Sequence, residues 1–126
     1  MKSIQKLLII GFAAAAFPAL AAPPAGDPAL GKKAFSQCQA CHAVDAKSPP
    51  RMGPTLAGVY GAKVATRPGY AYSAPMKALA AKWDEAMLDR WLAGPNTMAK
   101  GTKMAVAGIP DPKRRADLIA YMKTLK

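Results

Sequence analysis

Cys38 and Cys41 are the only cysteines in the chain, and His42, its only histidine, follows them directly. The pattern C-x-x-C-H is the attachment signature of c-type haem. Two thiols about one helical turn apart can each reach a vinyl group on the same edge of a porphyrin. The histidine is then carried beneath the ring, where a ring nitrogen can bind iron. We therefore expect thioether bonds at Cys38 and Cys41, an axial iron ligand in His42, and a fold that wraps a large apolar group.

Three other uses of the cysteine pair are weaker. A zinc site needs about four ligands, and the chain has only two cysteines and one histidine. A dithiol redox motif belongs to a βαβ setting, and the chain has no alternating strand pattern. A disulfide across two intervening residues is strained and uncommon. The pattern therefore favours haem over zinc, dithiol chemistry or a structural disulfide.

The first 21 residues have the pattern of a secretory signal peptide. Lys2 and Lys6 form a positive n-region, residues 7–17 an apolar h-region, and residues 19–21 a small-residue cleavage pattern. The h-region is too short to span a bilayer comfortably, so an uncleaved membrane anchor is the weaker alternative. We expect residues 1–21 to be a cleaved signal, residues 22–126 to form one small domain, and the mature protein to be periplasmic.

A marked basic excess indicates the kind of partner. The net charge is +11, and without Lys2 and Lys6 the 16 basic and 7 acidic residues that remain give +9. This excess suits nucleic acid, an acidic membrane surface or an acidic protein. An exported chain seldom meets nucleic acid, and the chain lacks the basic stripe with interleaved aromatic residues that single-strand binders use. An acidic protein is the expected partner.

Capping signals and apolar spacing predict a helical domain without a sheet. Asp27-Pro28 and Asp111-Pro112 each place an N-cap before a proline at the first helical position. Asp84 is expected to cap another helix that Gly94-Pro95 ends. Gly31 lies inside the first helix and indicates close approach to another element. Helices are predicted over residues 28–37, 72–81, 85–93 and 112–125, with irregular chain over residues 43–69 and 96–108.

A second axial ligand has to come from a residue other than histidine. Six methionines follow the signal segment: Met52, Met76, Met87, Met98, Met104 and Met122. Met87 and Met122 fall on predicted helix faces and are expected in the core. Met104 ends a glycine-containing loop that can bring a thioether to a metal, Met98 is the nearest competitor, and a lysine is the other kind of donor. Thioether ligation raises the reduction potential relative to two nitrogen ligands.

Several short motifs, each different, follow His42 along the chain. They are Gly53-Pro54, the segment Gly69-Tyr70-Ala71-Tyr72, Trp83, and Gly101-Thr102-Lys103-Met104. With Gly31 and Phe35 before the cysteines, this order resembles the class I cytochromes c, the mitochondrial type and its close bacterial relatives. The resemblance covers nearly all of the mature chain. It implies an all-α fold in which three to five helices and long loops wrap one covalently bound haem c.

The resemblance also implies how the axial ligands are held. Met104 would be the second axial ligand. The carbonyl of Pro54 would accept from the far ring nitrogen of His42 and fix its tautomer. Gly31 would let the N-terminal helix cross the C-terminal helix near Leu118.

The remaining implied roles concern the haem environment. Tyr72 and Trp83 would donate to a buried haem propionate, with simple core packing as the alternative. Thr102 would lie on the other side of the propionates. Trp91 falls where the family usually has a tyrosine that donates near the methionine sulfur.

Several positions depart from the family pattern. Lys100 replaces a proline, which predicts a more mobile ligand loop. Val106 stands where an aromatic side chain usually covers the haem face. Ala62 replaces an arginine that often supports a propionate, and Lys63 is adjacent to it.

By resemblance the protein would carry single electrons between redox proteins and would not be an enzyme. Its partners would be an acidic donor and acceptor, such as an oxidase, reductase or dehydrogenase, with no nucleic acid and no stable membrane insertion. Lys33, Arg51 and Lys103 could surround the exposed haem edge, and the protein is expected to be a monomer. The alternative is a haem enzyme or ligand sensor in which Met104 dissociates and leaves the iron open.

Overall fold

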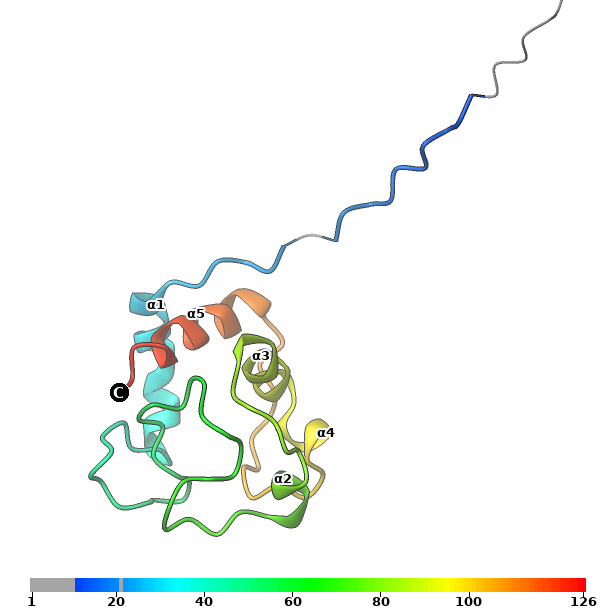
Figure 1. Ribbon diagram of the computed structural model, residues 1–126. Coiled ribbons are helices and arrows are strands. Elements are labelled where there is room, and N and C mark those ends of the chain that lie inside the picture. Colours follow the sequence, from blue (N-terminus) through cyan, green and yellow to red (C-terminus); the bar gives the residue numbers. More distant parts are fainter. Residues whose placement is uncertain (1–10, 21) are drawn as a thin grey trace, which may run out of the picture.

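The computed structural model describes residues 11–20 and 22–126. Residues 11–20 form no helix and extend away from the folded body (Figure 1). Phe12, Phe17 and Leu20 are almost fully exposed in this arm. Lys2, Lys6, part of the apolar h-region and the last residue of the cleavage pattern lie outside the described residues. Within the described ranges, no helix has the length and hydropathy to cross a bilayer.

The two terminal helices, α1 and α5, cross at one end of the body (Figure 1). Helix α1 spans Pro28–Ala34 and α5 spans Pro112–Met122. A Cβ on Gly31 would overlap the backbone carbonyl of Asp117, so only glycine permits this approach. Phe35 and Leu118 are fully buried there. The predicted close approach at Gly31 is confirmed, and it fixes one end of the core.

The predicted N-caps are confirmed, whereas several helix ends differ from the prediction. Asp27, Asp84 and Asp111 all accept backbone N–H groups at helix starts. Helix α1 gives way after Ala34 to a 3-10 helix, η1 (Phe35–Ala40), which carries Cys38. Helix α5 ends at Met122, and its last turn tightens into i to i−3 hydrogen bonds. Such tightening satisfies terminal carbonyl groups that an α-helix leaves open.

Three short helices complete the helical content of the described residues. Helix α3 spans Glu85–Ala93, as expected. Helix α2 spans only Ala74–Lys77, because Ala80 adopts a left-handed conformation (φ 44°) that ends helical geometry. The prediction of irregular chain from residue 96 was wrong at its start, since α4 spans Pro95–Met98 with Pro95 at its first turn.

The long loops are held by paired backbone groups rather than by a sheet. In the described chain the only bridge outside the helices joins Lys63 to Lys82. Next to it, Gly61 N–H donates to the Trp83 carbonyl at 2.8 Å, and Trp83 N–H donates to the Ala62 carbonyl at 2.8 Å. Because buried backbone groups need such partners, these bonds keep the irregular segment in place around the core.

Candidate haem site

A cavity of about 520 Å³ opens between the loops and α3, and the predicted site residues line it. Its walls are mainly apolar, with Leu56, Val59, Leu88, Leu92 and Ile109 among the lining residues. All nine residues predicted for the site line it: Cys38, Cys41, His42, Pro54, Tyr72, Trp83, Trp91, Thr102 and Met104. Residues from both halves of the chain therefore share one apolar space.

His42 is held in one orientation by the loop that follows it. Its Nδ1 lies 2.7 Å from the carbonyl oxygen of Pro54. A carbonyl only accepts, so Nδ1 carries the hydrogen and Nε2 keeps its lone pair. Gly53 lies directly against the ring, where a Cβ would come within 2.8 Å of Nδ1. Burial lowers the pKa of His42, and the Pro54 hydrogen bond opposes this, so the neutral form suited to metal binding is favoured.

The two thiols lie at the C-terminal end of η1, beside His42. The N–H groups of Cys41 and His42 both donate to the Cys38 carbonyl, at 3.1 and 2.9 Å. Both thiols are free and half-buried. Burial raises the pKa of the Cys38 thiol, while the charge of Arg114 opposes that shift. The arrangement presents two thiols and one imidazole along a single wall of the cavity.

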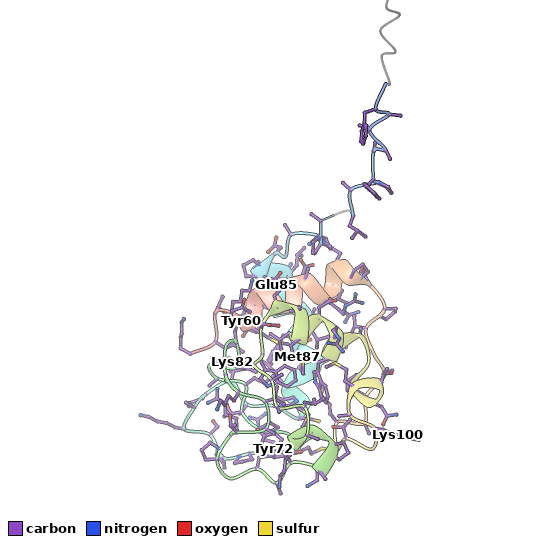
Figure 2. The ribbon with its side chains drawn as sticks, turned by 45° about the vertical axis from the view of Figure 1, so that its right-hand side comes forward. Tyr60, Tyr72, Lys82, Glu85, Met87 and Lys100 are labelled. Carbon is purple, nitrogen blue, oxygen red and sulfur yellow. The ribbon has the colours of Figure 1, made fainter. Side chains whose placement is uncertain are left out.

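Of the two candidate loop methionines, only Met104 reaches the cavity. Met98, at the end of α4, packs against the hydrophobic core but does not line the cavity. The loop before Met104 is ordered by Thr102, whose N–H donates to the Ala99 carbonyl at 2.9 Å and whose hydroxyl accepts from the Met104 N–H at 3.4 Å. Lys100 lies at the outer edge of this loop, beside α4 (Figure 2). The higher mobility predicted for this loop, because Lys100 replaces a proline, stays a prediction.

The aromatic residues of the site divide into two groups. Trp83 and Trp91 are buried and pack edge to face, with ring centroids 5.6 Å apart. Tyr72 is half-buried and lies at the end of the body that carries α2, away from α1 and α5 (Figure 2). Its hydroxyl accepts from the Arg67 N–H at 3.2 Å. The tryptophan pair therefore has a packing role in the core in addition to any contact with the cavity.

Sequence reasoning missed one charged residue that lines this cavity, Arg67. Neither the spacing nor the residue type of Arg67 indicated a site residue. Arg67 stands in a loop between two left-handed residues, Ala65 (φ 58°) and Gly69 (φ 79°). The Arg67-Pro68-Gly69 turn was the available signal, yet a turn does not indicate what its side chains face. Only the folded loop brings Arg67 to the site.

The geometry fits a covalently attached haem. Two thiols, an imidazole nitrogen with a free lone pair and a thioether sulfur all line one apolar cavity. These are the donor types that hold haem c in His/Met-ligated proteins. The family model for cytochrome c matches residues 28–126, which is most of the chain. The chain belongs to the cytochrome c family.

Individual relatives agree with the family assignment. The chain is similar to a cytochrome c2 of Rhodomicrobium vannielii, with 42% identity over 98% of this chain and 97% of that protein. It is also similar to a cytochrome c-554 of Methylosinus trichosporium, with 40% identity over 97% and 92% of the two chains. The solved structure of cytochrome cH from Methylobacterium extorquens matches with a TM-score of 0.74 and 48% identity, covering 79% of this chain and 99% of that one.

Membership establishes the coarse function. The protein is a class I cytochrome c with one covalently bound haem c, and it is an electron carrier rather than an enzyme. The all-α fold predicted by resemblance is confirmed. The role of each site residue, the location of the protein and its partners belong to the proposal that follows.

Proposed function

We propose that the mature protein, residues 22–126, carries single electrons between acidic redox proteins in a bacterial periplasm. The observation that carries this proposal is the convergence of Cys38, Cys41, His42 and Met104 on one apolar cavity. Cys38 and Cys41 would hold the haem through thioether bonds, and His42 and Met104 would bind its iron. When bound, the haem supplies a one-electron Fe(III)/Fe(II) couple.

The chain's own residues would hold the iron ligands in the same positions as an electron enters and leaves. Pro54 fixes the tautomer and direction of the His42 ring through the 2.7 Å hydrogen bond. Thr102 positions the backbone of Met104. The apolar walls exclude water, which limits the reorganisation that a change of charge demands. With His42 and Met104 both bound to the iron, the metal would offer no site for a substrate.

Exposed basic side chains would supply the docking surface. Lys33, Arg51 and Lys103 are exposed, and Lys103 itself lines the cavity. A basic rim attracts an acidic donor and then an acidic acceptor, each of which exchanges one electron with the carrier. The acidic partners would be an oxidase, a reductase or a dehydrogenase, and the carrier acts as a monomer.

The ligand assignment is tested by the absorption spectrum of the purified holoprotein. The oxidised protein should show the weak far-red charge-transfer band of methionine ligation. Met104→Ala should lose this band, whereas the control Met98→Ala should keep it. The colour should remain with the polypeptide after acid-acetone extraction. A high-spin ferric spectrum in the wild type would instead indicate an open iron site and overturn the His/Met carrier.

The location is tested by expression in a bacterium with c-type haem maturation. We expect the red protein in the periplasmic fraction, with a mature N-terminus near Ala22 in its intact mass. Lys2→Glu with Lys6→Glu should reduce export, because the positive n-region is lost. A full-length protein retained in the membrane fraction would contradict cleavage and favour the membrane anchor.

A further inference from the structure

The charged residues that line the cavity are all cationic. Among the described lining residues, Lys63, Arg67 and Lys103 carry charge, and no Asp or Glu is present. An apolar cavity with several cations and no carboxylate has a local excess of positive charge. That excess favours a ligand group with negative charge at the part of the cavity where the cations lie.

Arg67 is the cation whose charge is least compensated by its surroundings. It is half-buried, and Nη2 donates to the carbonyl oxygen of Ala57. In the described part of the chain, each of the three ion pairs involves another cation, so Arg67 has no carboxylate partner there. A guanidinium partly withdrawn from water is stabilised when its remaining donors and its charge find a partner.

The other two cations are better accounted for by the fold. Lys63 is exposed to solvent, and its backbone forms the bridge to Lys82. The Lys103 amine donates to the Ala71 carbonyl and lies 5.8 Å from the centroid of the Tyr70 ring. The first amine is open to solvent, and the second has backbone and ring contacts. Arg67 is therefore the cation that most needs an anionic group inside the cavity.

A second donor lies next to Arg67. The Tyr72 hydroxyl accepts from the Arg67 backbone N–H at 3.2 Å, and both residues line the cavity. Because that bond uses an oxygen lone pair, the hydroxyl hydrogen stays free to donate. Burial raises the pKa of Tyr72, so the hydroxyl keeps its hydrogen, although the Arg67 amide and charge act against the shift. Two donors from one short loop thus face the same space.

We propose that Arg67 pairs with a propionate of the bound haem and thereby sets the reduction potential of this cytochrome. Haem carries carboxylates, and the planar fork of an arginine matches a carboxylate with parallel hydrogen bonds. Ala62, where the family often has an arginine, has only a methyl side chain. Arg67 reaches the cavity from a position five residues further along. The inference rests on the proposed function, in which this cavity holds the haem.

The charge of Arg67 has two consequences with defined signs. A positive charge near the haem favours the reduced state, which carries one positive charge less, so it raises the potential. The same charge keeps the propionate ionised to lower pH. Replacing Arg67 by a neutral residue should therefore lower the potential and move the propionate pKa upward.

The test measures the midpoint potential of purified holoprotein across the acid to neutral pH range. Arg67→Gln should lower the equilibrium constant for reduction by about threefold to tenfold, which is about 28 to 59 mV for one electron. The pH below which the potential begins to rise should also move upward. Lys63→Gln is the matched control, since it removes the same charge from an exposed lining residue, and its shift should be far smaller. Arg67→Lys should recover most of the potential at neutral pH.

Equal potentials and pH profiles in Arg67→Gln and Lys63→Gln would overturn the proposal, because a residue that only braces Ala57 would change stability alone. If Arg67→Gln does not fold, Arg67→Lys carries the test, since it keeps the charge but lacks the fork. Its pH profile should shift upward, and an unshifted profile would refute the pairing. The far-red band separates the two proposals. If the wild type lacks the band, the His42 and Met104 ligand set is wrong. If the Arg67 variants keep the band and have the potential of the wild type, only the role of Arg67 is wrong.

Discussion

The contact between Gly53 and His42 shows how one missing side chain positions a ligand. Gly53 is buried, and its N–H donates to the Cys41 carbonyl at 2.9 Å. A Cβ at this position would lie 2.8 Å from Nδ1 and 3.0 Å from Nε2 of the His42 ring. The ring has little freedom to yield, because Nδ1 is hydrogen-bonded to the Pro54 carbonyl. Glycine is required here by space around the ring.

Gly53→Ala is expected to displace the His42 ring and weaken the Pro54 hydrogen bond. Overpacking of this kind costs about 1–3 kcal/mol of unfolding free energy. Guanidinium unfolding of the holoprotein should show the loss, and the visible spectrum should shift because the proximal ligand has moved.

Gly61→Ala serves as the control for this substitution. Gly61 has φ 83°, and a Cβ there meets no atom within 4 Å. The Gly61→Ala protein should lose about 1–2 kcal/mol of unfolding free energy through the left-handed backbone alone, and its haem spectrum should stay unchanged. A Gly53→Ala protein with the wild-type spectrum and stability would refute the steric argument.

At the scale of elements, the crossing of α1 and α5 includes a polar contact. The Asp117 carboxylate, buried in α5, accepts from the Asp27 N–H at 2.7 Å and from the Lys113 amine. Asp27 is itself the N-cap of α1. The Lys113 hydrogen bond, followed by that of Asp27, lowers the pKa of Asp117, against the opposing effect of burial. One carboxylate thus joins the start of α1 to the middle of α5.

Asp117→Asn should therefore destabilise the protein in a pH-dependent way. A carboxyl whose pKa is lower in the folded state adds stability above its unfolded pKa, about 4, and loses it as the pH falls through the lower folded value. The difference in unfolding midpoint between wild type and variant should be largest at neutral pH and should shrink in acid. Urea unfolding at a series of pH values measures it.

Asp45→Asn is the matched control for the charge removed. Asp45 is exposed in the loop after the haem-binding motif and belongs to neither terminal helix. It should change the unfolding midpoint little and with no such trend. A difference between wild type and Asp117→Asn that stays constant from neutral to acid pH would contradict a coupling through the carboxylate charge.

The starts of α1, α3 and α5 could be predicted from the sequence, whereas the ends of α1, α2 and α5 could not. Asp27, Asp84 and Asp111 cap as predicted because a cap is a bond between neighbours in sequence. The ends depend on tertiary contacts. Leu30 in α1, for example, is 47% exposed despite its apolar side chain, because the crossing with α5 buries the Gly31 side of the helix.

The whole molecule has a surplus of positive charge that should act on electron exchange over distance. Residues 22–126 carry a net charge of +9, while only three ion pairs form in the described residues. A net charge of this size creates a potential that attracts anions before contact. The Debye length is about 10 Å at an ionic strength of about 0.1 M, so added salt shortens its reach.

We expect oxidation of the reduced protein by an anionic iron hexacyanide complex to slow about tenfold or more as ionic strength rises from about 10 to about 300 mM. Oxidation by a cationic metal hexaammine complex should speed up over the same range, since repulsion is screened. Stopped-flow kinetics measure both rates. The cationic reagent is the control, and parallel responses of the two reagents would show that net charge does not steer the encounter.

The sequence by itself determined the haem attachment motif, the helix caps and the family, because each is written in residues that are near one another or regularly spaced. It also left Met98 and Met104 as candidate ligands. Only the tertiary structure decided which of them lines the cavity, and only it placed Arg67 there, about 25 residues beyond the motif. Long loops carry no periodic signal, and their course is set by packing and by backbone pairing across the fold. A cavity wall built from such loops exists only once the chain has folded.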